Sequence, residues 1–436
     1  MKNLNSVLKF TKNVVLLQMV AVFAFAGATL PRSGLTSDQP ITAEAVFSTP
    51  GPDSQRPVIN AILSAQHKIQ MWMFSMSNPE VISALKTAAG KGVTIEIIFD
   101  KGMFKGTNAF VNDLQATRGI TINQASKAFS LSHAKTFIVD DSRAYIMTLN
   151  LTKNFPVQRD TGVETSDASI VADLQTLFAA DLRNSQSGGS ETPSLSNSNL
   201  VISPTDSTSE ILALINSAQQ SIELTVENLG QRDVIAALIA THARGVDVKV
   251  ITPLCDMNPN SGYNVPGLKQ LSSAGVQARA MGYPATAAMP YMHQKMIIVD
   301  GARFFVGSEN FSMNSLSAAR EIGVIVKVDE TTAVVEQNFA TDWAAAQDIN
   351  NIPPQTKCKA IELAPDSTTQ PTADSGSSLS PTTDSSSEAG SSITKKVTPT
   401  KKVSAVKKSS STKSRAKKVS SNLFKNLTAK ELHLAS

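Results

Sequence analysis

The sequence predicts an α/β fold made of two copies of a βαβ repeat, with two mixed sheets flanked by helices and a site at the pseudo-twofold interface between the copies. Two segments resemble each other at a constant spacing, both copies carry the same short motif, and helical and strand-like apolar patterns alternate in each. The 436 residues suffice for two such units with their own cores, and the composition, 41% hydrophobic with two cysteines, excludes collagen, coiled-coil and disulfide-scaffold proteins.

The repeat is visible before any motif is considered. Residues 64–74 resemble residues 217–227, and residues 88–100 resemble residues 241–253, both at an offset of 153. Each copy reads as an amphipathic helix, a strand, a helix, a Gly-Val turn and a second strand, and this βαβ order predicts largely parallel sheets. The offset later becomes 160, which predicts one insertion of about seven residues in the loop around residues 255–267.

The termini and linkers divide the chain further. Residues 1–28 have the basic start, apolar run and small residues of a cleaved secretory signal peptide, so we expect an exported protein, secreted or periplasmic. The predicted repeats span residues 40–183 and 201–362. Residues 184–200 read as a linker, residues 363–393 as a disordered Ser/Thr/Pro-rich linker, and residues 394–436 as a disordered Lys-rich tail.

The net charge of +4 conceals a strong segregation. The tail carries twelve Lys and Arg against the single Glu431, whereas residues 29–364 carry 25 basic and 31 acidic residues. The tail is therefore either a solvated tether or an electrostatic contact for anionic lipid or nucleic acid. Cys255 and Cys358 either pair or remain buried thiols, and their spacing is not that of a zinc site.

The motif H-x-K-x4-D occurs twice. It gives His133, Lys135 and Asp140 in the first copy and His293, Lys295 and Asp300 in the second. Period-two geometry places each His and Lys on one strand face, so a pair from each copy can meet at the interface. Two lysines can offset phosphoryl charge while one imidazole attacks phosphorus and the other protonates the leaving oxygen. The motif places Asp140 and Asp300 among the catalytic candidates with the histidines and lysines, although on the opposite strand face they are as compatible with a structural role as with contact to substrate.

These motifs make the chain resemble the phospholipase D superfamily, whose signature is a pair of such "HKD" motifs. The resemblance extends beyond the motifs. Gly307, Ser308 and Asn310 follow the second motif as in the family, and Thr148 and Asn150 follow the first, where Met147 occupies a position that is usually glycine. The segments beginning at Arg159 and Arg320 also match. It implies that Thr148, Asn150, Ser308 and Asn310 bind or support phosphate, that Asp160 and Glu321 orient the histidines, and that Met147 narrows or reshapes its side of the pocket. It also implies His133 as nucleophile, His293 as general acid/base, and no metal or other cofactor.

The resemblance implies a phospholipase D-type enzyme that hydrolyses or transphosphatidylates glycerophospholipids such as phosphatidylcholine at a membrane surface. The acidic body favours this reading over a secreted, metal-independent endonuclease of the same superfamily, which remains the alternative. The intact motifs disfavour a non-catalytic binding module. A cardiolipin synthase is also disfavoured, because such synthases usually retain N-terminal transmembrane helices, whereas we interpret residues 1–28 as a cleaved signal peptide. One chain supplies both halves of the site, so a monomer suffices.

Overall fold

The computed structural model describes residues 41–50, 55–104, 108–153, 157–255, 262–282 and 285–353. The predicted signal peptide, the Ser/Thr/Pro-rich linker and the Lys-rich tail lie outside these residues. No helix within the described ranges is both long and apolar enough to cross a membrane.

The first repeat forms one sheet with strand order β1-β7-β6-β5-β2-β3-β4. Its elements are β1 (Ala45–Thr49), α1 (Arg56–Ser64), β2 (Lys68–Met73), α2 (Pro79–Gly90), β3 (Thr94–Phe99), η1 (Lys101–Phe104), α3 (Ala109–Gln115), β4 (Ile120–Gln124), β5 (Lys135–Val139), β6 (Arg143–Met147), β7 (Gln158–Thr165) and α4 (Ala168–Ser187).

The second repeat forms a sheet with strand order β16-β11-β10-β9-β13-β14-β15-β8. Its elements are β8 (Leu200–Ser203), α5 (Ser207–Asn216), β9 (Ser221–Thr225), α6 (Arg232–Ala243), β10 (Asp247–Pro253), α7 (Val265–Ser273), β11 (Gln277–Met281), β12 (Tyr291–Met292), β13 (Met296–Val299), β14 (Arg303–Gly307), α8 (Met313–Ser317), β15 (Glu321–Lys327), α9 (Val334–Ala345), β16 (Gln347–Asp348) and η2 (Ile349–Asn351). β12 leaves this sheet and pairs in parallel with β7 of the first repeat.

Both sheets are mixed, as predicted, but the expectation that they are largely parallel is wrong. Apart from the pair of β12 with β7, parallel pairing of strands is confined to β2-β3-β4 and β9-β10-β11, where helices cross over between strands. From β5 and β13 onward the strands pair antiparallel. The reason is local: β5 and β6 are joined by a tight turn in which Asp140 and Asp141 adopt positive φ, and such a turn reverses the chain.

Two predicted boundaries also change. Helix α4 begins after the N-cap Asp167, whose side chain accepts from two backbone N–H groups, and ends at Gly188, whose φ of 76° suits a glycine. The helix therefore enters the predicted 184–200 linker by four residues. The offset between repeats rises in two steps, from 153 at β3 and β10 to 157 at β4 and β11 and 160 at β5 and β13, so the single predicted insertion is replaced by two shorter ones.

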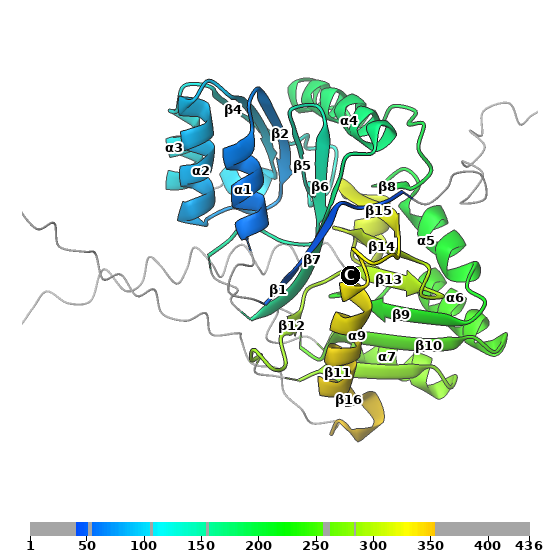
Figure 1. The fold of residues 1–436 in the computed structure, drawn as a ribbon. Helices are drawn as coiled ribbons and strands as arrows, with labels where there is room; N and C mark the ends of the chain where they lie inside the picture. Colours follow the sequence, from blue (N-terminus) through cyan, green and yellow to red (C-terminus); the bar gives the residue numbers. More distant parts are fainter. Residues whose placement is uncertain are drawn as a thin grey trace, which may run out of the picture. The chain divides into compact units, whose positions relative to one another are not determined.

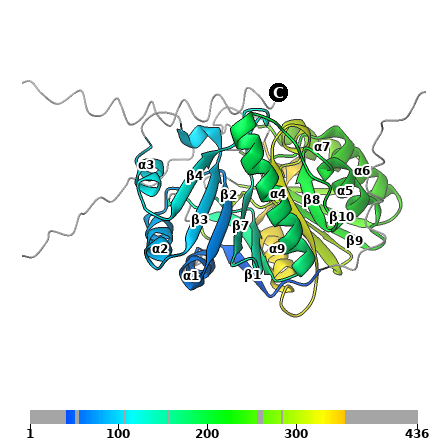
Figure 2. The same ribbon diagram turned by 90° about the horizontal axis from the view of Figure 1, so that it is seen from above.

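The core forms where the two sheets face each other. Helices α1–α3 cover the outer side of one sheet and α5–α7 that of the other, while α4 and α9 lie between the repeats (Figures 1 and 2). Side chains from both repeats meet in this central region, among them Trp72, Phe178, Phe304 and Phe339, all at most 1% exposed. Burial of this size at the interface holds the two repeats as one unit.

Cys255 follows β10 and is 3% exposed. It is disulfide-bonded in the structure, which resolves its state in favour of pairing over a buried thiol. Cys358, the other cysteine of the chain, lies outside the described residues.

Candidate active site

Each histidine of the repeated motif lies just before a central strand and contacts the other repeat. The N–H of His133 donates to the carbonyl of Arg320 (2.8 Å), and the N–H of His293 donates to that of Arg159 (3.1 Å). The short strand β12 pairs with β7 and so places His293 next to the first repeat. A parallel bridge between Ser132 and Arg320 places His133 next to the second repeat. The predicted meeting of both motifs at the interface is therefore confirmed.

A carboxylate from the opposite repeat holds each imidazole. The Nδ1 of His133 lies 2.9 Å from Oε2 of Glu321, and the Nδ1 of His293 lies 2.7 Å from Oδ1 of Asp160. An ionised carboxylate only accepts, so Nδ1 carries the proton and Nε2 is the atom available for chemistry. Asp160 and Glu321 thus make the contacts that the resemblance implies, each across the interface, and their orienting role in a reaction stays a prediction.

Two hydroxyls fix these carboxylates. Thr148 donates to Oδ1 of Asp160 (2.6 Å), and Ser315, which was not predicted, donates to Oε1 of Glu321 (2.6 Å). The hydroxyl of Ser308 accepts from the backbone N–H of Ile322 (3.0 Å), while its carbonyl lies 3.2 Å from Nδ1 of His133. Thr148 and Ser308 thus support the imidazoles within the protein.

The two asparagines differ. The Asn310 oxygen accepts from the N–H of Asn228 (3.1 Å), and its amide nitrogen lies 3.4 Å from Glu227. The side-chain oxygen of Asn150 is buried and has no hydrogen-bond partner among the described residues. Asn310 is therefore held in place, whereas the predicted phosphate contact of Asn150 stays a prediction.

Both motif lysines are fully buried, and each ammonium donates to the carbonyl of the histidine two residues before it. Lys135 lies 4.9 Å from the ring centre of Phe74, a cation–π distance. The pKa of Lys135 is lowered to about 7: burial lowers it most, the charge of Lys295 also lowers it, and the carboxylate of Glu321 opposes both. Lys295 instead forms an ion pair with Glu227 at 3.0 Å.

The pKa of His133 is lowered, chiefly by burial; Glu321 raises it, and the positive charges of Lys135 and Lys295 lower it. The pKa of Glu321 is also lowered: burial raises it, but His133 and Lys135 lower it more. The structure therefore favours an ionised Glu321 beside a His133 whose Nε2 is unprotonated at neutral pH, the state that a nucleophile requires.

The two motif aspartates do not belong among the catalytic candidates. Asp140 accepts from the backbone N–H groups of Gln66, His67 and Lys68 (2.7–2.9 Å), and Asp300 accepts from those of Gln219, Gln220 and Ser221 (2.7–3.1 Å). Burial raises the pKa of each carboxyl, but these backbone donors lower it more. Because period two turns them away from the histidine face, they cap the segments that lead into β2 and β9.

Met147 does not narrow the site. It packs in the core beneath α1 and α2, because alternation along β6 turns it away while Thr148 faces Asp160. Its equivalent Gly307 lies opposite Gly323 in the register of β14 and β15, where a side chain on Gly307 would meet the Gly323 backbone at 2.5 Å. The glycine of the second copy is therefore a packing requirement of that sheet.

Besides Ser315, sequence reasoning missed Glu227 and a set of ion pairs between the repeats. Glu227 is 7% exposed and contacts Lys295, His293 and Asn310. Beyond the site, two buried Arg–Asp pairs also cross the interface, Arg159 with Asp342 (2.7 Å) and Arg320 with Asp181 (3.1 Å). Their repetition at equivalent positions was the available signal for the pairs, and the end of the repeated segment 217–227 was the signal for Glu227.

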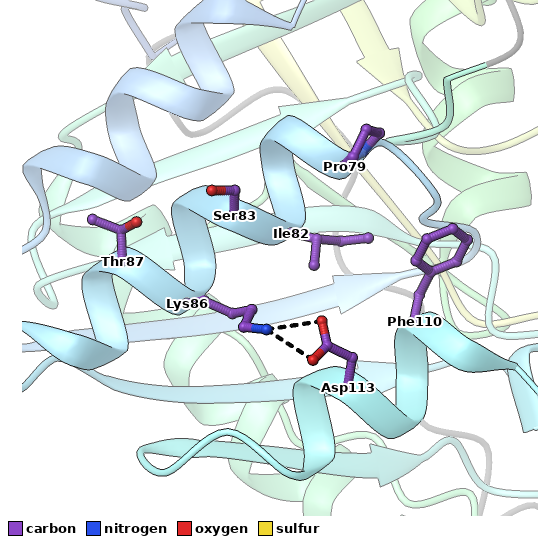
Figure 3. Close-up of a pocket in the computed structure, with 7 residues that line it drawn as sticks. All are labelled: Pro79, Ile82, Ser83, Lys86, Thr87, Phe110 and Asp113. Atoms are coloured by element: carbon purple, nitrogen blue, oxygen red, sulfur yellow. Dashed lines mark hydrogen bonds and ion pairs between the residues drawn. The ribbon is translucent and has the colours of Figure 1, made fainter. Parts of the chain in front are cut away.

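A separate hollow lies on the outer face of the first repeat, between α2 and α3 (Figure 3). It is lined by Pro79, Ile82, Ser83, Lys86, Thr87, Phe110 and Asp113, and the ammonium of Lys86 pairs with the Asp113 carboxylate at 2.8 Å across it. None of the twelve predicted site residues lines it, so the hollow plays no part in the chemistry of the histidines.

Comparison with known proteins identifies a family whose model matches both repeats. Residues 58–182 and 211–343 match a family model described as "Cardiolipin synthase, PLD-like domain". The two matched ranges together cover more than half of the chain and contain both motifs.

Individual relatives are distant. The minor cardiolipin synthase ClsB of Bacillus subtilis (strain 168) is 24% identical over 330 residues, covering 68% of this chain and 80% of that protein. Phospholipase D Y of Dictyostelium discoideum is 28% identical over 122 residues, so the chain spans about a quarter of that relative (27%) and the match covers 28% of the chain. The crystal structure of a phosphatidylserine synthase from Haemophilus influenzae Rd KW20 has the same fold, with a TM-score of 0.55 at 12% identity, covering 71% of this chain and 88% of that one.

Proposed function

The chain belongs to the phospholipase D superfamily, and we propose that it is a phosphodiesterase that cleaves the head-group ester of glycerophospholipids such as phosphatidylcholine. The observation that carries this proposal is the pair of buried His–Lys units, each with its imidazole held at Nδ1 by a carboxylate of the opposite repeat. Two imidazoles oriented in this way supply a nucleophile and an acid, and two ammoniums offset the charge of one phosphodiester.

In the first step, the Nε2 lone pair of His133 attacks phosphorus, and a P–N bond forms as the P–O bond to the head group breaks. His293 gives its Nε2 proton to the departing alcohol oxygen, so the alcohol leaves neutral and His293 becomes a neutral imidazole. Glu321 stabilises the positive charge that develops on His133, because its carboxylate lies 2.9 Å from Nδ1.

In the second step, neutral His293 takes a proton from water, and the resulting hydroxide attacks phosphorus and displaces His133. Phosphatidic acid is released, and both imidazoles return to their starting protonation states. An alcohol that replaces this water gives transphosphatidylation by the same path. Lys135 and Lys295 stay in place, because each is tied to the carbonyl of its own motif histidine.

A lipid substrate is supported by charge. Residues 29–364 have 25 basic against 31 acidic residues, and a surface of that balance does not attract a polyanionic nucleic acid. Two of the relatives, a phospholipase D and a cardiolipin synthase, carry the names of lipid enzymes. Export through the signal peptide, and a contact of the basic tail with anionic lipid, complete the proposal.

A second candidate is transfer of the phosphatidyl group to another phospholipid, as in a cardiolipin synthase. It is favoured by the match to the Bacillus subtilis protein, which covers 68% of this chain and 80% of that relative. The chemistry differs only in the acceptor, an alcohol of phosphatidylglycerol instead of water, so the same residues would serve both reactions.

The test offers the purified protein three substrates in parallel with EDTA present: phosphatidylcholine vesicles, phosphatidylglycerol vesicles and supercoiled plasmid. We expect choline release without plasmid nicking. Cardiolipin formation from phosphatidylglycerol without choline release would favour the second candidate, and nicking alone would establish the endonuclease. His133→Ala should abolish the observed reaction, whereas His67→Ala, which alters an exposed histidine of the same repeat, should leave it intact.

A further inference from the structure

The two repeats place different side chains beside their motif lysines. Phe74 follows β2 and Glu227 follows β9, and the two positions are equivalent at the offset of 153. Each lies at the end of a strand that pairs with a motif strand, β2 with β5 and β9 with β13. One repeat therefore presents an aromatic ring to its His–Lys unit, and the other presents a carboxyl group.

The carboxyl group of Glu227 is bound on every side. Its Oε2 lies 3.0 Å from Nζ of Lys295, 3.5 Å from Nε2 of His293 and 3.4 Å from the Asn310 amide nitrogen, and its Oε1 accepts from the hydroxyl of Tyr291 (2.8 Å). Burial raises the pKa of Glu227, but the charges of Lys295 and His293 and the hydrogen bonds to the carboxylate lower it more. The pKa of Glu227 therefore stays well below its usual range. Glu227 is a buried carboxylate at neutral pH.

The first repeat has no carboxylate at this place. The ring of Phe74 meets the imidazole of His133 edge-on at 4.6 Å and lies 4.9 Å from the Lys135 ammonium. An aromatic ring stabilises the ammonium far less than an ion pair does, which agrees with the lowered pKa of Lys135, about 7. Nothing at the Phe74 position holds a proton on Nε2 of His133.

The charges that face the two imidazoles therefore differ in balance. His293 faces the carboxylates of Asp160 on β7 and Glu227 after β9, the phenol of Tyr291 on β12, and the ammonium of Lys295 just before β13. His133 faces the carboxylate of Glu321 and the ammoniums of Lys135 and Lys295. The imidazole of His293 thus contacts two carboxylates, whereas that of His133 contacts one and has the ring of Phe74 at the position equivalent to Glu227.

We propose that Glu227 is a positioning residue that holds the proton on Nε2 of His293 and thereby makes His293 the acid and His133 the nucleophile. This inference rests on the proposed two-step reaction and explains which histidine takes which role in an otherwise twofold site. The contact of 3.5 Å is longer than a hydrogen bond, so Glu227 stabilises the imidazolium without taking the proton that the leaving oxygen needs.

The test compares Glu227→Gln with the wild type on two diesters that differ in their need for an acid. Bis(p-nitrophenyl) phosphate releases p-nitrophenolate, which leaves without protonation, whereas the choline of phosphatidylcholine must be protonated as it leaves. We expect phosphatidylcholine turnover to fall about 10²-fold, the p-nitrophenolate burst to change less than about threefold, and the alkaline limb of the kcat profile to move to lower pH.

The matched control is Glu223→Gln, on β9 four residues earlier, where the carboxylate forms a half-buried pair with Lys249 (3.6 Å). It should leave both rates and the pH profile unchanged. An equal loss of Glu227→Gln on both diesters, or no loss on either, would overturn the inference. A wild type that cleaves neither diester would instead contradict the proposed function; if plasmid is the diester it cleaves, plasmid replaces phosphatidylcholine in the comparison.

Discussion

The two halves of the site are alike on the Nδ1 side of the histidines and different on the Nε2 side. On the Nδ1 side, Glu321 and Asp160 hold the imidazoles at 2.9 and 2.7 Å, and each carboxylate accepts a hydroxyl hydrogen bond at 2.6 Å. On the Nε2 side, Glu227 lies 3.5 Å from His293, and the equivalent residue of the first repeat is Phe74, whose ring meets the His133 imidazole edge-on at 4.6 Å. The difference shows how a duplicated site can give its two histidines different roles. A carboxylate orients the imidazole in both halves, and the difference between Phe74 and Glu227 determines which histidine keeps its Nε2 proton.

The largest expected effect separates the two histidines themselves. His133→Ala should lower turnover by about 10⁴-fold or more and remove the p-nitrophenolate burst with bis(p-nitrophenyl) phosphate, because no nucleophile remains. His293→Ala should lower turnover comparably yet retain a single stoichiometric burst, since that leaving group needs no acid. Stopped-flow absorbance measures both, and a burst that survives in His133→Ala but not in His293→Ala would reverse the roles.

The next effect tests the twofold part of the site. Glu321→Gln and Asp160→Asn should each lower kcat by about 10²- to 10⁴-fold with little change in KM, because each imidazole loses the partner that fixes its Nδ1 proton. Glu164→Gln, on β7 four residues after Asp160 and paired with Arg143 at 3.3 Å, serves as control. A loss confined to one of the two carboxylates would show that the frame is not functionally twofold.

A smaller effect concerns pH. Because the pKa of Lys135 is lowered to about 7, its ammonium is charged below that pH and neutral above it. The inhibition constant of diethyl phosphate, a monoanion throughout this range, should therefore rise about tenfold between pH 6 and pH 8. Lys135→Met should bind this anion weakly at both pH values, and an inhibition constant of the wild type that is flat across the range would contradict the assignment.

The smallest effect on catalysis is expected at the motif aspartates. Asp140→Asn and Asp300→Asn each weaken a cap on three backbone N–H groups, so the free energy of unfolding should fall by about 1–3 kcal/mol while kcat stays within about twofold. Urea denaturation and steady-state kinetics measure the two quantities. Since the pKa of Asp140 is lowered in the fold, its contribution exists above its ordinary value and is lost as pH falls, so the stability difference should shrink in acid. A large kcat loss in a stable variant would return these residues to the active site.

The sequence predicted the parts of the site that depend on short spacing. Alternation along one strand was enough to place His133 with Lys135, and duplication placed the second pair opposite. The orienting carboxylates followed from the family resemblance, but their crossing between repeats depends on how β12 pairs with β7. Glu227 was missed because its contact with Lys295 depends on the register of β9 with β13, which no local pattern reveals.

The sheets show the same limit. The βαβ order correctly predicted the parallel strands β2-β3-β4 and β9-β10-β11, because the spacing of apolar residues predicts the helices that connect them. It overestimated their extent, because the reversal after each motif depends on a two-residue turn at Asp140 and Asp141 or at Asp300 and Gly301 in positive φ. That turn is set by the same aspartates that the motif alone suggested as catalytic.

The central claim is that His133 alone carries the phosphoryl group between the two steps. A direct measurement is rapid quenching in base after mixing the protein with a ³²P-labelled phosphodiester, followed by mapping of the acid-labile label to a peptide. We expect ³²P on the peptide that contains His133 in the wild type and in His293→Ala, and no labelled peptide in His133→Ala. Label on the peptide that contains His293, or turnover of the wild type without any labelled peptide, would contradict it.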